Sequence, residues 1–166
     1  MPPPVPSFDQ PAPTRVAVLD SPDRRVTAEI SFFEPCASGP RVRVRAFRPG
    51  AASSTFHLAS AAAVNFSLDS RWLVMHDRAA IVLWSACSSG VKHFRSPRSQ
   101  AGGWFGWSRR CVIQSVTEVE GSLMVRYDEP AHDGRSVQVL PLNGSAGWLE
   151  GPGPTPCALG STNSLT

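Results

Sequence analysis

The chain has 166 residues, of which 42% are hydrophobic and 17% are charged, and its formal net charge is +3. This length suits one domain with a sizeable core, and so small a net charge does not by itself indicate a nucleic-acid-binding protein. Lys92 is the only lysine beside many arginines, and this usage, with abundant Ala and Pro, is typical of a GC-rich bacterial genome.

The first 14 residues are rich in proline, which disfavours both helix and paired strand, so we expect a disordered tail. They lack the basic and apolar regions of a signal peptide. No stretch of the chain approaches the ~18 apolar residues of a membrane-spanning helix. The sequence therefore predicts a cytoplasmic protein that makes no contact with a membrane.

Residues 15–58 predict a first unit of four short strands. β-Branched and aromatic residues occur in runs bounded by Ser, Pro, Gly and Asp, which is the pattern of strands and turns. The predicted strands are Val16–Leu19, Val26–Phe33, Arg41–Phe47 and Thr55–Leu58. Short connections between them indicate an antiparallel meander.

Residues 61–96 predict a second unit of the same kind, and it has the clearest pattern in the chain. A short strand near Val64 is followed by strands at Trp72–Met75, Ala80–Trp84 and Val91–Arg95. The two central strands are apolar at every position, so they must be covered on both faces.

Two segments of this unit carry a resemblance to a known family. The segment 64–73, VNFSLDSRWL, resembles the Phe-Ser-Pro-Asp-Gly-Arg-Trp-Leu opening of blades in WD-repeat and TolB-like β-propellers. The segment 81–84, IVLW, closed by Gly90, resembles the later Ile-x-Leu-Trp-Asp segment of such blades. Leu68, Ser70 and Ser85 depart from the Pro, Gly and Asp of that pattern. The resemblance implies four-stranded blades and an interaction scaffold, although a fold does not fix a function.

Residues 104–142 predict a third copy. Its expected strands are Trp104–Trp107, Cys111–Glu120, Leu123–Asp128 and Ser136–Leu140, with a shortened turn at Ser108–Arg110. Aligning Arg25, Arg71 and Arg110 gives separations of 46 and 39 positions, close to the ~40–45 residues of a propeller blade. Trp148–Leu149 could add an edge strand or lie across the core. The uncharged segment 151–166 is predicted to be a disordered tail.

The burial pattern differs among the units and predicts how they stack. In the first unit Val42 and Val44 alternate with arginines, and in the third Leu123 and Val125 alternate with Met124 and Arg126, so those strands bury one face only. We therefore expect one all-β domain, residues 15–150, of three stacked antiparallel meanders that resemble an open or partial β-propeller. A β-sandwich or barrel without a true repeat is the alternative. Three blades cannot close a ring alone, so the chain is either an open monomer or a homodimer.

Two groups of residues are candidate partner-binding sites. The first is the stripe of Arg41, Arg43 and Arg45 on one face of a strand, whose neighbours Phe32, Phe33 and Phe47 are interpreted as core. The second combines aromatic and basic side chains, which are enriched in binding hot spots, and consists of Trp104, Phe105, Trp107, Arg109 and Arg110.

Signals for chemistry are weak. Cys36, Cys87, Cys111 and Cys157 have no metal-ligand spacing, so we predict neither a metal nor a cofactor. His76-Asp77 and His132-Asp133 are the only tempting catalytic pairs, and both fall in predicted turns. We therefore predict a non-catalytic module that binds another protein, of the immunity or inhibitory type. An arginine-mediated nucleic-acid-binding protein and a small hydrolase remain alternatives.

Overall fold

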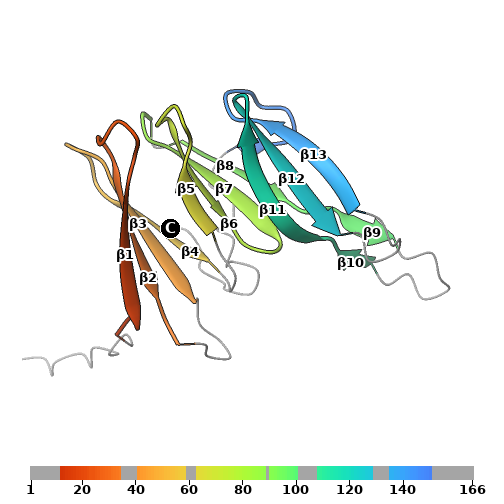
Figure 1. The fold of residues 1–166 in the computed structure, drawn as a ribbon, viewed down its shortest axis with the longest axis horizontal. Helices are drawn as coiled ribbons and strands as arrows, with labels where there is room; N and C mark the ends of the chain where they lie inside the picture. The colour runs from red at the N-terminus through yellow and green to blue at the C-terminus, as the bar shows by residue number, and fades with distance from the viewer. Residues whose placement is uncertain are drawn as a thin grey trace, which may run out of the picture.

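The protein is built from β-strands. The computed structural model describes residues 12–34, 41–58, 63–88, 90–100, 108–128 and 135–150, and these ranges contain no helix. Accordingly, nothing in them is a helix of the length and apolarity needed to cross a membrane. The strands form three open antiparallel sheets, stacked as layers, and a short two-stranded ribbon (Figure 1). The predicted all-β fold is confirmed, and none of the described sheets closes into a barrel.

The first sheet has the strand order β1-β2-β3-β4. Its strands are β1 (Arg15–Asp20), β2 (Thr27–Phe32), β3 (Val42–Phe47) and β4 (Ser54–Leu58). Val42, Val44 and Ala46 are buried, whereas Arg43 and Arg45 between them point the other way. One face of this sheet therefore packs on the core and the other forms the outside of the stack.

The middle sheet has the order β14-β8-β7-β6-β5. It consists of β5 (Ala63–Phe66), β6 (Trp72–His76), β7 (Ala80–Ser85), β8 (Val91–Arg95) and the two-residue edge strand β14 (Leu149–Glu150). Every residue of β7 is buried. The edge strand predicted at Trp148–Leu149 is thus present, and the Trp148 side chain is also buried in a core.

The third sheet has the order β11-β12-β13, and the ribbon pairs β9 with β10. The sheet consists of β11 (Val112–Val119), β12 (Ser122–Asp128) and β13 (Arg135–Pro141). The ribbon strands are β9 (Arg98–Gln100) and β10 (Ser108–Arg110). The turn predicted at Ser108–Arg110 is therefore wrong, because these residues pair with β9. The strand predicted at Trp104–Trp107 lies outside the described residues.

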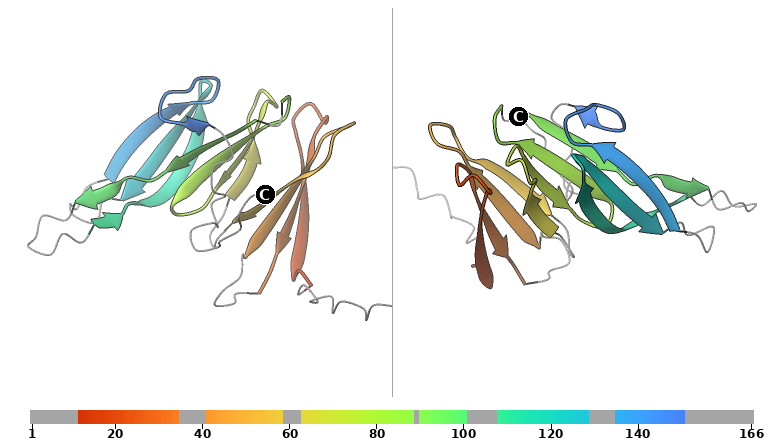
Figure 2. Two further views of the ribbon diagram at one scale, coloured as in Figure 1. Left: turned by 180° about the vertical axis from the view of Figure 1, so that it is seen from behind. Right: turned by 45° about the horizontal axis from the view of Figure 1, so that its top comes forward.

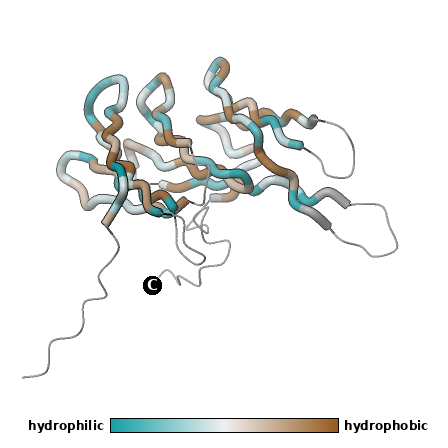
Figure 3. The backbone as a smooth tube through the Cα atoms, turned by 60° about the horizontal axis from the view of Figure 1, so that its bottom comes forward, coloured by the Kyte–Doolittle hydropathy of each residue, from teal (hydrophilic) through white to brown (hydrophobic). Residues whose placement is uncertain are grey.

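Two hydrophobic cores separate the three layers. Leu73, Met75, Val82 and Trp84 of the middle sheet pack against the first sheet, including Val44 and Leu58. Alternate residues of the same two strands face the third sheet, where Val74, Ile81 and Leu83 meet Leu123, Val125 and Leu140. The predicted three-layer stack is confirmed, with the middle sheet covered on both faces (Figure 2). Figure 3 shows hydrophobic and hydrophilic residues alternating along the strands.

The same turn joins β1 to β2 in the first sheet and β5 to β6 in the middle sheet. Ser67 Oγ donates to Asp69 Oδ1 over 2.6 Å and accepts the N–H of Trp72 at 3.0 Å, while Asp69 Oδ1 accepts the N–H of Arg71. Ser21, Asp23, Arg25 and Val26 make the same contacts 46 positions earlier. Arg24 (φ 59°) and Ser70 (φ 61°) occupy the same left-handed position of the turn. The predicted correspondence between these two units is thus present in atomic detail.

The third sheet departs from that repeat. Its first strands are joined by Glu120 (φ 48°) and Gly121 (φ 75°), between the paired residues Val119 and Ser122. Two residues with positive φ form the tight turn that matches the twist of an antiparallel hairpin. Arg110 lies in β10 and is not the counterpart of Arg25 and Arg71.

Candidate binding surfaces

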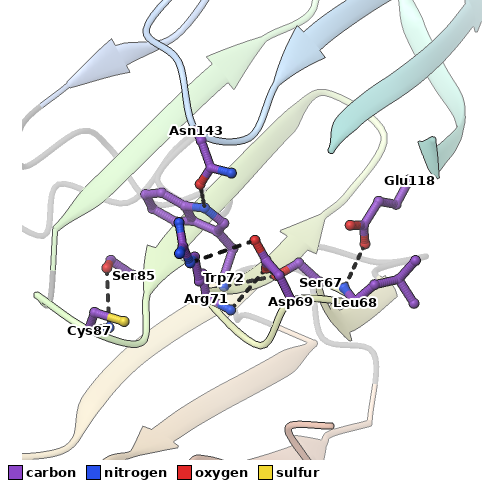
Figure 4. A network of polar contacts seen from close by, with 9 residues as sticks. All are labelled: Ser67, Leu68, Asp69, Arg71, Trp72, Ser85, Cys87, Glu118 and Asn143. Carbon is purple, nitrogen blue, oxygen red and sulfur yellow. Dashed lines mark hydrogen bonds and ion pairs between the residues drawn. The ribbon is translucent and has the colours of Figure 1, made fainter. Parts of the chain in front are cut away.

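The turns of successive layers are tied together along one edge of the stack. The N–H of Asp23 donates to Ser70 Oγ over 3.0 Å, which joins the first sheet to the middle one. The N–H of Leu68 donates to Glu118 Oε2 over 2.9 Å, which joins the middle sheet to the third (Figure 4). Trp72 Nε1 donates to Asn143 Oδ1 at the same edge. These bonds fix how the layers stack and therefore where their outer faces point.

The charge state of the Asp69 turn follows from these contacts. Burial acts to raise the pKa of Asp69, but the Ser67 hydroxyl, the N–H and the charge of Arg71, and Asn143 together lower it below its usual range. The pKa of Asp23 is lowered in the same way, by Ser21 first and then by the N–H of Arg25. Both carboxyls are thus ionised acceptors at neutral pH.

The arginine stripe predicted on β3 lies on the outer face of the first sheet. Arg41, Arg43 and Arg45 occupy alternate positions, opposite in direction to the buried Val42 and Val44. Arg43 and Arg45 are half-buried, whereas Arg41 is exposed. The structure therefore brings these three predicted residues together on one surface.

Two phenylalanines complete this surface, and their interpretation as core residues is wrong. The Arg43 guanidinium lies 5.4 Å from the centre of the Phe33 ring, and that of Arg45 lies 5.1 Å from the centre of the Phe47 ring. The rings fall on the outer face because Phe33 and Phe47 keep the alternation of their strands away from the buried set. Phe32 faces the first core as predicted.

The rest of the outer face mixes apolar and polar side chains. Val16 and Val18 on β1 are 50% and 65% exposed and are neighbours on one strand face, as Val137 and Val139 are on the outer face of the third sheet. Glu29 on β2 is directly opposite both Val18 and Arg45 in the register of the sheet. We call the set Val16, Val18, Glu29, Phe33, Arg43, Arg45 and Phe47 the outer patch.

The second predicted site falls largely beyond what the structure describes. Trp104, Phe105 and Trp107 lie outside the described residues, and for Arg109 only the backbone, in β10, is described. Arg110 is half-buried, and its Nη1 donates to the carbonyl oxygen of Ser96 over 2.7 Å. The ribbon lies at the far end of the molecule from the first sheet, so the two predicted sites belong to different surfaces (Figure 1).

The His76-Asp77 pair lies at the β6–β7 turn, which Asp77 stabilises. Asp77 is buried, and its Oδ1 accepts the N–H groups of Ala79 and Ala80 at 2.8 and 2.9 Å, which shapes the β6–β7 turn. Nδ1 of His76 has no hydrogen-bond partner among the described residues. Burial lowers the pKa of His76, and Asp77 partly opposes this shift. Asp77 therefore shapes the turn and also acts on the imidazole of His76. The His132-Asp133 pair lies outside the described residues.

The third sheet carries a pocket, and the described chain has no metal-binding cluster. Gln114, Ser115, Arg126, Tyr127 and Asp128 line a pocket of about 260 Å³ beside the irregularity in β11. In the same ranges there is no cluster of three or more His, Cys, Asp or Glu side chains that could hold a metal ion.

Comparisons with known proteins give no relative. No protein-family model, curated protein or solved structure matches this chain. The resemblance to propeller blades therefore stays a prediction.

Sequence reasoning missed part of both surfaces. Val16 and Val18 were predicted as strand residues without an assigned face, because Val16–Leu19 is apolar at every position and shows no alternation that separates the two faces. The sequence also did not predict that Arg98 lies opposite Arg110. Strands β9 and β10 are short and polar, so they show no hydrophobic alternation that would reveal the pairing.

Proposed function

We propose that the protein is a non-catalytic module that binds another protein through the outer patch. The observation that carries this proposal is the combination of exposed valines with arginines stacked on phenylalanine rings. Arginine and aromatic side chains are enriched in protein-binding hot spots, and a flat sheet face with exposed apolar residues suits a broad contact.

The arrangement of the arginines supports binding. A guanidinium held over an aromatic ring gains about 0.5–1 kcal/mol at an exposed site and has fewer conformations to lose when a partner docks. Arg43 and Arg45 are half-buried against Phe33 and Phe47 in this way. They thus present rigid donors that favour a partner with carboxylates beside an apolar patch.

The charges of the patch favour a protein over a nucleic acid. Glu29 stands opposite Arg45, and Val18 stands opposite Glu29 on its other side. A carboxylate beside the arginines would repel a phosphate backbone, and two exposed valines would gain nothing from it. The same mixture of charged and apolar groups suits the surface of a protein partner. An inhibitory or immunity-type role, in which the patch covers the working surface of the partner, is the specific form of this proposal.

The test compares the wild type with a variant of the outer patch. Tagged wild-type protein, the double variant Val18→Lys/Arg45→Glu and the matched control Val139→Lys are used to capture proteins from source cells. Val139 is a suitable control because it is 61% exposed on the outer face of the third sheet. The captured protein is then purified and titrated by calorimetry against all three.

We expect the wild type and the control to bind the same protein equally, and the double variant to bind at least about 10-fold more weakly, since buried interface charges are costly to reverse. Equal affinity of the captured protein for the double variant and the wild type would contradict the proposal. Circular dichroism checks that all variants remain folded.

A further inference from the structure

Strand β1 forms an open edge of the first sheet. Within the described part of the chain β1 pairs with β2 alone, so its other side has no strand beside it (Figure 1). An unpaired edge is a template for another strand, and natural edge strands are commonly protected by a bulge, a proline or a charge within the strand. The central segment 16–19, VAVL, contains none of these. β1 is therefore open to pairing along its centre.

The hydrogen-bond pattern of the sheet identifies which residues of β1 turn their backbone groups to this edge. The N–H of Ser21 donates to Val26 O over 2.9 Å, directly beyond the last register pair of β1 and β2. Residues that exchange hydrogen bonds alternate with residues that do not along an antiparallel pair. Counted back from Ser21, the odd-numbered residues of β1 bond to β2. The N–H and C=O groups of Val16 and Val18 therefore point to the free edge.

These edge groups are complementary to those of a second copy of the same strand. When two β1 strands run antiparallel about a two-fold axis at Ala17, Val16 of each strand lies opposite Val18 of the other. Both of these pairs then occupy positions that exchange backbone hydrogen bonds. Residues directly opposite each other in antiparallel strands point to the same face, so the valines of both copies meet on the outer face.

The charges at the two ends of β1 favour this antiparallel arrangement. Arg15 begins the strand, and its guanidinium lies 4.1 Å from the centre of the Phe32 ring. Asp20 ends the strand, and its Oδ1 accepts the hydroxyl of Thr27 over 2.8 Å. Antiparallel pairing sets the Arg15 end of each strand beside the Asp20 end of the other. Parallel pairing would bring like charges together, which is unfavourable in a sheet.

We propose that the protein forms a two-fold symmetric homodimer in which the β1 strands of two copies pair and join their first sheets into one. Val16 and Val18, which are 50% and 65% exposed in the single chain, cover each other across the joint. Ala17 and Leu19, which pack partly buried against the first core, continue that core toward the axis. The valines keep their outward direction, so the outer patches of the two copies form one continuous surface.

The edge strand β13 of the third sheet is less suited to such pairing. The N–H of Leu142 donates to Gly121 O over 3.0 Å, so by the same alternation the odd-numbered residues of β13 turn their backbone groups to its free edge. The last of them is Pro141, which has no N–H to donate. β13 begins with Arg135 and has no acidic residue at its other end, so antiparallel pairing brings no opposite charges together.

The first test measures the oligomeric state of the purified full chain by sedimentation velocity over a range of concentrations. The variant Val18→Pro removes an N–H that faces the free edge and leaves the hydrogen bonds to β2 in place, because proline is tolerated at such edge positions. The matched control is Val139→Pro, at an exposed valine that faces the free edge of β13. Circular dichroism checks that both variants remain folded.

We expect the wild type to sediment as a dimer, with twice the mass of the chain. Val18→Pro should weaken dimerisation at least about 10-fold, since each copy loses one hydrogen bond across the joint. Val139→Pro should dimerise within about twofold of the wild type, because its substitution lies outside the joint.

A second test uses a disulfide and does not depend on the proline variants. Ala17 lies opposite itself at a non-hydrogen-bonded position, where the two Cα atoms are about 4.5 Å apart, which suits a disulfide. In a chain with Cys36, Cys87 and Cys157 replaced by serine, Ala17→Cys should give a covalent dimer on mild oxidation. Val18→Cys should form it more slowly, because Val18 lies opposite Val16.

Four results would overturn the proposal. A monomeric wild type at every concentration would mean that the edge is covered in another way, for instance by residues 1–11, which lie outside the described residues. Equal weakening by the two prolines, or weakening by Val139→Pro alone, would remove β1 as the joint. Failure of Ala17→Cys to cross-link faster than Val18→Cys would exclude the axis at Ala17. The proposal does not rest on the partner of the outer patch, and oligomeric state is measured without that partner, so the two proposals can fail separately.

Discussion

Single residues in the repeated turns adopt a backbone conformation that side chains disfavour. Arg24 and Ser70 have φ values of 59° and 61°, in the left-handed region, where a non-glycine residue costs roughly 1–2 kcal/mol. The two positions differ in what the side chain does. Ser70 Oγ accepts the N–H of Asp23 from the neighbouring layer, whereas Arg24 is exposed.

Arg24→Gly is therefore expected to raise the free energy of unfolding by up to about 1 kcal/mol, because glycine adopts positive φ without a steric penalty and the gain exceeds its entropic cost. Ser70→Gly should gain less, since it also removes the acceptor of the interlayer hydrogen bond. Urea denaturation of both variants measures the difference. A larger stabilisation by Ser70→Gly than by Arg24→Gly would show that the interlayer bond contributes nothing.

At the scale of elements, β7 is the strand on which both cores depend. Val82 and Trp84 pack toward the first sheet, and Ile81 and Leu83 toward the third. All four are less than 2% exposed. A strand without a polar face has no position at which volume can be lost without leaving a cavity.

Leu83→Ala is expected to lower the free energy of unfolding by about 2–5 kcal/mol, the usual cost of a cavity in place of a fully buried leucine. Val139→Ala, on the outer face of the third sheet, should change it by less than about 0.5 kcal/mol. Chemical denaturation of the two variants checks this contrast. A loss below about 1 kcal/mol for Leu83→Ala would mean that the second core is loosely packed.

The strands also show how much of the fold can be predicted from the sequence. The strands of the first and middle sheets are predictable to within about two residues, since Ser, Asp and Gly bound apolar runs. The alternation in β3 and β12 correctly predicts outer sheets with one buried face. The ribbon is not predictable, because Arg98–Gln100 and Ser108–Arg110 carry no apolar pattern. The prediction that Phe33 and Phe47 are core residues is wrong, because an aromatic ring covered by an arginine is stable on an outer face.

For the whole molecule, histidines that are wholly or partly buried link stability to pH. Burial lowers the pKa of His57, His76 and His93 below the usual 6.5, with Arg43 adding to the shift of His57 and Arg95 to that of His93. The unfolded chain therefore binds protons more readily than the folded one as the pH falls through about 6.5. The stability that these residues contribute is present above that pH and is lost below it.

We expect the urea midpoint to be lower at about pH 5.5 than at about pH 7.5, a window above the titration of Asp23 and Asp69, whose pKa values are lowered below 3.8. His93→Gln should reduce the difference between the two midpoints, since an amide does not titrate in this range. An unchanged difference would show that His93 accepts a proton as easily in the folded state as in the unfolded one.

The doubly covered middle sheet has a consequence for synthesis on the ribosome. Its strands β5–β8 are complete by residue 95, but the residues that cover Val74, Ile81 and Leu83 come from 111–148, and its own edge strand β14 ends only at residue 150. At about 5–20 residues per second, the nascent chain exposes this apolar surface for several seconds. Chaperone demand should therefore be greatest while the second half of the chain is being translated.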